Sequence, residues 1–181
     1  MVRKLLLTAI IALPFSLLSI IATAQTSTPE SAGDGAKMTK DDIIILMVQV
    51  GRVPVVQQDR KMETIWENMD GSQTPRSDFL FCTGFAYLGN YKAQACLGHA
   101  YEKGRGADRD FADAYVWYSI ALENPIKDPA DKLRIQADRD RMRKVLLSGT
   151  PARTEKELND LIKTQKAFRA ECLAEVRDTK F

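Results

Sequence analysis

The feature that most constrains the fold is the stretch from Asn90 to Asn124, where small and aromatic residues recur at helical spacing. This spacing predicts two helices joined by the turn sequence GRGADR. Alanines and a glycine on the facing surfaces allow the two helices to approach closely. Leu97, Tyr101 and Trp117 are expected to fill the space around them.

The turn between these helices also has a definite chemistry. Gly104 and Gly106 can adopt the positive φ angles that a tight turn requires, and Asp110 is placed to cap the second helix. A phosphate-binding loop is the alternative, but GRG lacks the third glycine, the lysine and the preceding strand of such loops. The glycines therefore predict a structural turn.

With these residues, the stretch resembles the Sel-one-like repeat, a relative of the tetratricopeptide repeat. The family pattern is A-x-x-x-L-G-x-x-Y-x-x-G-x-G-V-x-x-D-x-x-x-A-x-x-W-Y-x-x-A, and Ala107 departs from it where valine is preferred. The resemblance implies an antiparallel α-solenoid and adaptor or scaffold work, in exported members often at the bacterial envelope or with host cells. The matching residues are Ala93, Leu97, Gly98, Tyr101, Gly104, Gly106, Asp110, Ala114, Trp117, Tyr118 and Ala121.

One such repeat cannot bury a core alone, so degenerate neighbours are expected before it. Two registers compete. In one, Gly89-Asn90 closes the preceding repeat and Phe81-Cys82 occupies its Trp-Tyr positions. In the other, Val53-Pro54, Asp59 and Trp66 supply its turn, cap and tryptophan. The sequence leaves both open.

The rest of the chain predicts further helices and no credible sheet. The apolar run Ile43–Val50 suits a buried strand, but no second strand is available to pair with it, so a buried helix is expected. Helix starts are expected at Thr39 with Asp42, at Ser77 or Asp78, and at Thr154 with Glu157. Seven helices are expected in all. The apolar minority of the charged segment at 128–147 is Leu133, Ala137, Val145 and Leu146.

The first 24 residues have the layout of a secretory signal peptide. Arg3 and Lys4 precede an apolar run, and Ala22-Thr23-Ala24 offers a cleavage site. An uncleaved anchor is the alternative. The expected organisation is a signal peptide (1–24), a flexible linker (25–38) and an α-solenoid repeat domain (39–181, best repeat 90–124) in a periplasmic or secreted protein.

Composition narrows the classes of ligand. Two of the 26 basic residues lie in the leader, so the remaining basic residues balance the 24 acidic ones. This balance argues against nucleic acid as a partner. With one histidine and no zinc spacing, we expect no metal and no cofactor. No tight membrane insertion is expected after the leader is removed, and the oligomeric state is left open.

The three cysteines suit an oxidising compartment. Cys82 and Cys96 fall on adjacent predicted helices and could form a disulfide, or could remain buried thiols. Cys172 is left free or intermolecular.

The candidate partner-binding residues are Tyr91, His99, Glu102 and Tyr115. Tyr91 and Tyr115 are expected to be exposed, and His99 to lie at the surface or an edge. We therefore expect an exported protein–protein interaction module with no catalytic residues. The alternative is a hydrolase of cell-wall or β-lactam substrates, for which S-x-x-K, G-x-S-x-G and H-E-x-x-H motifs are all missing.

Overall fold

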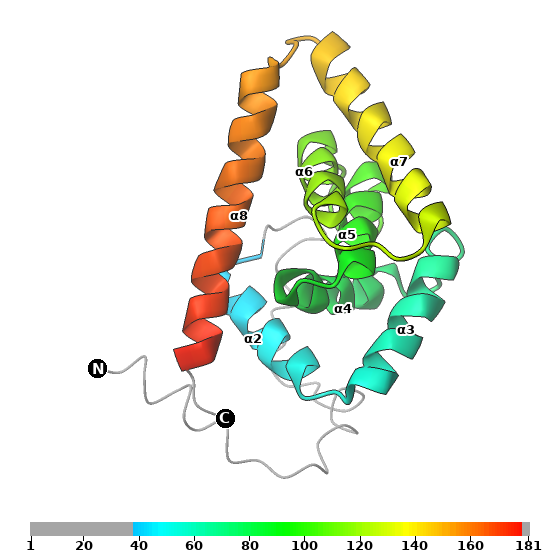
Figure 1. Ribbon diagram of the computed structural model, residues 1–181, viewed down its shortest axis with the longest axis vertical. Coiled ribbons are helices and arrows are strands. Elements are labelled where there is room, and N and C mark those ends of the chain that lie inside the picture. The colour runs from blue at the N-terminus through cyan, green and yellow to red at the C-terminus, as the bar shows by residue number, and fades with distance from the viewer. Residues whose placement is uncertain (1–37, 179–181) are drawn as a thin grey trace. The chain divides into compact units, whose positions relative to one another are not determined.

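The structure, a computed structural model, describes residues 38–178, which belong to one compact unit. The expected signal peptide at 1–24 and all but the last residue of the expected linker lie outside the described residues. Within 38–178 the chain forms seven helices and no strand, which confirms the all-α class (Figure 1). The helices are α2 (Lys40–Gly51), α3 (Val55–Glu67), α4 (Pro75–Leu88), α5 (Tyr91–Lys103), α6 (Phe111–Leu122), α7 (Pro129–Ser148) and α8 (Glu155–Asp178).

Local capping chemistry explains where several helices begin. The Thr39 side chain accepts a hydrogen bond from the backbone N–H of Asp42, and the Asp42 carboxylate accepts one from the backbone N–H of Thr39. The same reciprocal pair forms between Thr154 and Glu157 at the start of α8. Asp110 caps α6 by accepting from two backbone N–H groups. These predicted starts are confirmed, and they satisfy backbone donors that have no partner inside the helix.

The start of α4 differs from the prediction. Ser77 or Asp78 was expected to cap it, but the helix begins one turn earlier, at Pro75. Proline suits the first helical position because its fixed φ is already helical and it has no N–H to satisfy. The Asp78 carboxylate instead accepts a hydrogen bond from the hydroxyl of Ser72.

The run Ile43–Val50 lies inside α2. This confirms the helix that was predicted because no second strand was available to pair with the run. Its buried residues pack against α4, where Gly84 allows the two helices to approach closely. A Cβ built on Gly84 would lie 3.0 Å from the backbone oxygen of Leu46 and 2.8 Å from Val50. A side chain at this position would therefore push the two helices apart.

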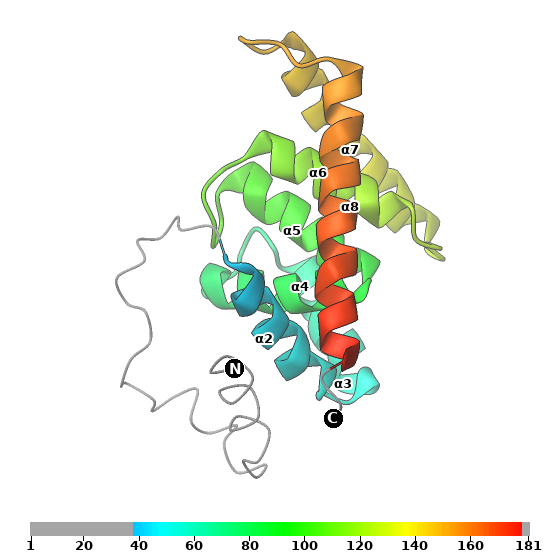
Figure 2. The ribbon, with the colours of Figure 1, turned by 90° about the vertical axis from the view of Figure 1, so that its left-hand side faces the viewer.

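The helices are arranged around the pair α5 and α6, which pack along each other. On one side α4 packs against α2 and α5, and α8 lies across α6, α4 and α2 (Figures 1 and 2). On the other side α7 packs against α6, and α3 packs against α5. The helix α3 thus contacts α5 more than it contacts its sequence neighbour α4, which departs from a regular stack of hairpins.

The α5–α6 contact has the close packing that its small residues predict. Ala93, Ala114 and Ala121 are fully buried between the helices and their neighbours. Gly98 faces the ring of Tyr118, and a Cβ on Gly98 would lie 2.7 Å from that ring. The missing side chain is what allows Tyr118 to lie flat against α5.

The turn after α5 uses both glycines. Gly104 and Gly106 have φ angles of 68° and 79°, which residues with a side chain rarely adopt. A Cβ on Gly106 would also lie 2.4 Å from the backbone oxygen of Pro75, and Arg76 donates a hydrogen bond of 2.8 Å to the Gly106 carbonyl. The turn therefore docks against the first turn of α4.

Candidate functional site

The four candidate partner-binding residues all have neighbours within the fold. The hydroxyl of Tyr91 donates a 2.8 Å hydrogen bond to Asp131 of α7, and Trp66 of α3 donates to the same carboxylate at 2.9 Å. Because Asp131 is buried, these bonds join α3, α5 and α7 at one point. Tyr91 is half-buried rather than exposed.

Glu102 is buried in a second polar cluster. Its carboxylate accepts hydrogen bonds from Arg141 of α7, at 2.7 and 2.8 Å, and from the Tyr118 hydroxyl at 3.0 Å. Lys103 lies 3.0 Å away. Burial alone would raise the pKa of Glu102, but the bonds from Arg141, Lys103 and Tyr118 together lower it. Glu102 therefore holds α5, α6 and α7 together as an anion.

His99 and Tyr115 are also buried, at 7% and 6% exposure, so their expected exposure is wrong. For Tyr115 the reason is that α6 is packed by α5, α7 and α8. For His99 the reason is the loop between α3 and α4, whose Asp70 brings Oδ1 within 2.9 Å of the imidazole Nε2, outside hydrogen-bond geometry. Sequence periodicity assigns a face of a helix but does not show which segment covers it.

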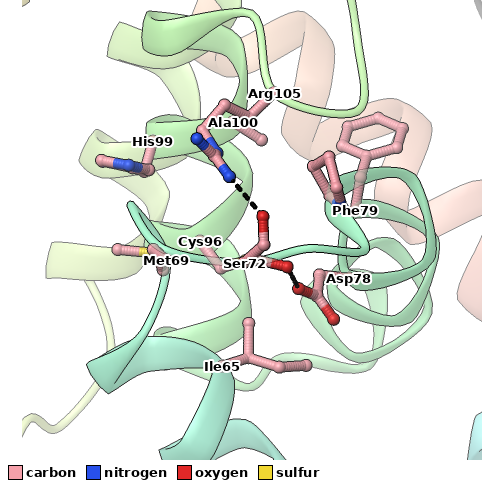
Figure 3. Close-up of a pocket in the computed structure, with 10 residues that line it drawn as sticks. Ile65, Met69, Ser72, Asp78, Phe79, Cys96, His99, Ala100 and Arg105 are labelled. Atoms are coloured by element: carbon pink, nitrogen blue, oxygen red, sulfur yellow. Dashed lines mark hydrogen bonds between the residues drawn. The ribbon is translucent and has the colours of Figure 1, made fainter.

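His99 lines a small cavity of about 20 Å³ beneath that loop (Figure 3). Arg105 donates a 2.7 Å hydrogen bond to the backbone oxygen of Ser72, and the Ser72 hydroxyl bonds to Asp78. Figure 3 shows the imidazole pointing away from Ser72. The cavity has about the volume of one water molecule, so it has no room for a larger ligand. The side chains that line it instead fasten the loop to α5.

The burial of His99 predicts a pH-dependent stability. Its pKa is lowered from 6.5, chiefly because burial penalises the charged ring, although Asp70 and Glu102 oppose the shift. The unfolded chain then binds this proton more readily than the folded one, so stability is lost as pH falls below about 6.5. We expect the free energy of unfolding to fall between pH 7.5 and pH 5.5, and to fall less in a His99→Gln variant.

Urea titrations at the two pH values measure this difference. Glu102 does not interfere, because its lowered pKa keeps it ionised above pH 5.5. Equal losses in the wild-type and variant proteins would show that His99 does not carry the effect.

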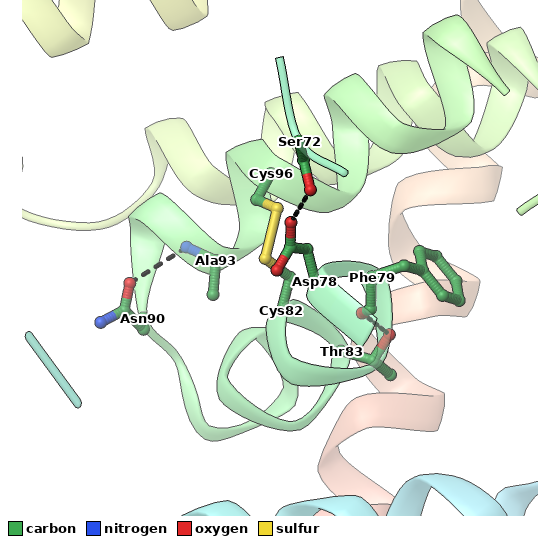
Figure 4. Close-up of a disulfide and its surroundings, with 8 residues drawn as sticks. All are labelled: Ser72, Asp78, Phe79, Cys82, Thr83, Asn90, Ala93 and Cys96. Atoms are coloured by element: carbon green, nitrogen blue, oxygen red, sulfur yellow. Dashed lines mark hydrogen bonds between the residues drawn. A yellow bond between two sulfur atoms is a disulfide. The ribbon is translucent and has the colours of Figure 1, made fainter. Parts of the chain in front are cut away.

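The disulfide that Cys82 and Cys96 could form is present and joins α4 to α5 (Figure 4). The Cα atoms are 6.2 Å apart, and the cysteines are 14 positions apart in sequence. Between them, Gly89 ends α4 with a φ of 106° and the Asn90 side chain caps α5. Cys172 is a free thiol, and burial raises its pKa.

A second cavity, of about 180 Å³, lies on the side of α5 and α6 that faces α2, α4 and α8. Leu97, Tyr101 and Trp117 were expected to fill this region, but here they line an open space. Ile43, Thr83, Tyr87, Leu97 and Trp117 form its buried floor, and Met38, Tyr101, Asp113, Gln165 and Phe168 form its half-buried rim.

Aromatic rings form part of the wall of this cavity, and their planes lie at steep angles to one another. Tyr87 lies 5.2 Å from Trp117 with the ring planes at 60°, and 6.1 Å from Phe168 with the planes at 83°. The Tyr87 hydroxyl accepts a 2.9 Å hydrogen bond from Gln165. Burial raises the pKa of Tyr87, so the hydroxyl is neutral. The rings are thus held in place by contacts between α4, α6 and α8.

Sequence reasoning missed this cavity for an identifiable reason. Leu97, Tyr101 and Trp117 carry a packing signal that predicts core positions, and Leu97 and Trp117 are indeed buried. Whether α8 closes over them or leaves a space depends on contacts of Gln165 and Phe168 with residues about 50 to 80 positions earlier. The start of α8 was recognisable at Thr154 and Glu157, but the position at which the helix docks was not.

Comparison with protein-family models, with curated proteins and with solved structures gave no match to this chain. Within residues 38–178, no helix is both long enough and apolar enough to cross a bilayer. Within the same range, no group of three or more histidine, cysteine, aspartate or glutamate side chains is arranged so that it could hold a metal ion.

Proposed function

We propose that the chain is an exported α-solenoid of the Sel-one-like kind, which binds a protein or peptide in the cavity between α2, α4, α5, α6 and α8. It acts as an adaptor of the bacterial envelope and performs no chemistry. The observation that carries this proposal is the cavity itself, with a buried aromatic floor and a half-buried rim. Such pockets accept an apolar or aromatic group and orient it with few polar contacts.

The repeat assignment is supported by the α5–α6 pair. Gly98 lies against Tyr118, two glycines have positive φ in the turn and Asp110 caps the second helix. These are the roles that the repeat pattern requires. The position of α3 against α5 is the departure from it, and we attribute this to decay of the preceding repeat.

Binding is favoured over catalysis by the partners of the reactive side chains. The Ser72 hydroxyl bonds to Asp78 while His99 faces Asp70, so serine and histidine do not form a nucleophile–base pair. Glu102 is bound by a cation and a tyrosine, which keeps it ionised rather than available as an acid. Each of these groups connects two segments of the fold.

Export is supported by two independent features. Residues 1–24 have the pattern of a signal peptide, and Cys82 and Cys96 are joined in a disulfide. Disulfides form and persist in the periplasm and outside the cell, and they are rare in the cytosol.

Site-specific photo-crosslinking to a displayed peptide library tests the proposed function. A benzophenone side chain replaces Phe168 at the rim in one variant, and exposed Leu133 on α7 in the matched control. We expect selected peptides to crosslink at position 168 and not at position 133, and to keep their mass after incubation with the protein. Equal crosslinking at both positions would contradict a cavity site, and cleavage of the peptides would indicate a hydrolase.

A further inference from the structure

We propose that the cavity between α2, α4, α5, α6 and α8 binds the side chain of a tyrosine in the partner peptide. This inference rests on the proposed function and adds the chemistry of the residue that enters the cavity. It depends on an indole N–H without a partner, on a free amide oxygen beside it, and on the aromatic wall and size of the space.

The indole N–H of Trp117 is a hydrogen-bond donor that lacks a partner in the described part of the chain. Within residues 38–178 it forms no hydrogen bond, and the nitrogen is not sealed from solvent, although Trp117 is only 4% exposed and lines the cavity. Trp66, the second tryptophan of the chain, differs because its indole donates to Asp131 at 2.9 Å. Buried indole N–H groups usually have an acceptor, so Trp117 indicates a ligand that supplies one.

Gln165 offers the complementary group at the same cavity. Its Nε2 donates a 2.9 Å hydrogen bond to the Tyr87 hydroxyl, whereas its Oε1 accepts none from residues 38–178. Tyr87 connects the two residues, because its ring centroid is 5.2 Å from that of Trp117. A phenol hydroxyl matches this pair of groups, since its oxygen can accept from an N–H while its proton is donated to a carbonyl oxygen.

The charge of the lining favours a neutral ligand. Asp113 is the one formally charged residue among the ten that line the cavity. It already has an interaction within the chain, so its charge is not assigned to a ligand. A charged side chain would lose its hydration in the cavity without gaining a counter-ion. A purely apolar side chain would displace water and leave the Trp117 N–H unpaired, whereas a neutral hydroxyl avoids both costs.

The aromatic wall and the size of the cavity favour a ring over an aliphatic acceptor. The ring planes of Trp117 and Phe168 lie at 60° and 83° to that of Tyr87, and aromatic rings that meet at such angles attract one another. The cavity of about 180 Å³ is slightly larger than the roughly 150 Å³ cavity that accommodates benzene. One phenol ring therefore fits, and it can enter past the half-buried rim at Tyr101 and Phe168.

NMR titration with short peptides tests the proposal. The probes are Gly-Gly-X-Gly-Gly peptides in which X is tyrosine, phenylalanine or glutamine, so that the ring and the acceptor are also presented separately. The readout is the indole N–H resonance of Trp117, with that of Trp66 as an internal control because it is already bonded to Asp131. We expect the tyrosine peptide to move the Trp117 resonance downfield. It should bind about tenfold more tightly than the phenylalanine peptide, which leaves the N–H unpaired, and more tightly than the glutamine peptide.

A pair of variants that each remove one indole N–H isolates the donor. Trp117→Phe should reduce the preference for tyrosine over phenylalanine to less than about twofold, whereas Trp66→Phe, outside the cavity, should leave it unchanged. Equal binding of the tyrosine and phenylalanine peptides by the wild-type protein, or a preference that survives Trp117→Phe, would overturn the inference. If Trp117→Phe does not fold, the wild-type indole resonance decides, because a tyrosine peptide that does not move it is not bonded to Trp117.

Two further arms test the identity of the occupant. Glutamine binding as tightly as tyrosine would show that the acceptor alone selects the ligand, and would overturn the assignment to an aromatic side chain. The titration is also run with free p-cresol, which is the tyrosine side chain without its backbone. A shift with p-cresol but with none of the peptides would give the cavity to a small phenol instead. Crosslinking of library peptides at position 168 would still support the proposed function if tyrosine were not preferred.

Discussion

Replacing both Cys82 and Cys96 with alanine is expected to lower the free energy of unfolding by about 3 kcal/mol. The bridge closes a loop of roughly 15 residues, and loop-closure entropy in the unfolded chain gives this magnitude. The two helices that it joins lie at the centre of the fold, since α4 also packs against α2, and α5 against α3 and α6. Loss of the bridge should therefore destabilise the whole described unit.

Chemical denaturation with and without a thiol reductant measures this effect. Cys172→Ala is the matched control because Cys172 is equally buried but forms no disulfide. Reductant should destabilise the wild-type protein and Cys172→Ala, and should leave the double variant unchanged. A double variant as stable as the wild-type protein would show that the bridge does not hold the helices together.

A valine at Gly98 should cost about 3 kcal/mol, the upper end of the usual range for overpacking a core. The Cβ alone would lie 2.7 to 2.9 Å from three carbons of the Tyr118 ring. That ring cannot withdraw easily, because Tyr118 is fully buried and its hydroxyl is bonded to Glu102. The clash should outweigh the gain in backbone stability, roughly 0.5–1 kcal/mol, that follows when a helical glycine is replaced.

The matched control is Gly51→Val at the end of α2, where an added Cβ would meet only Leu88, at 4.0 Å. Gly51→Val should change the free energy of unfolding by less than about 1 kcal/mol. If Gly98→Val were as mild as Gly51→Val, then α5 and α6 would not approach at this glycine.

The local features of this chain were predictable because they depend on neighbours in sequence. The capping pairs at Thr39 and Thr154, the stop at Gly89 and the turn at Gly104 each involve residues within a few positions of one another. Their backbone conformations follow from side-chain chemistry that is visible in the sequence. The helical character of Ile43–Val50 followed from the missing strand partner.

Burial of polar residues was not predictable in the same way. Tyr91 meets its partner 40 residues later in α7, Glu102 meets Arg141 39 residues later, and His99 meets Asp70 in an earlier loop. Such contacts depend on how distant helices pack, and periodicity within one helix carries no information about that packing. A polar residue whose position in the sequence predicts exposure can therefore be buried in the structure and join two helices.

The charged helix α7 shows the same limit. Its apolar minority included Leu133 and Val145, but these are 67% and 38% exposed. Ile135 and Met142 are buried instead, together with Asp131. The helix turns the face that carries Asp131 toward α3 and α5, because the bonds from Trp66 and Tyr91 satisfy that carboxylate. A buried, fully bonded acidic residue thus helps to fix the rotation of a helix.

Hydrogen exchange with a peptide from the library selection tests the account most directly, because it shows which helices the ligand protects. The account predicts slower amide exchange in α4 near Thr83, at the start of α6 near Asp113 and in α8 near Gln165, with no change in α3 or α7. Protection confined to α3 and α7 would contradict it, since the ligand would then lie on the opposite side of α5 from the cavity.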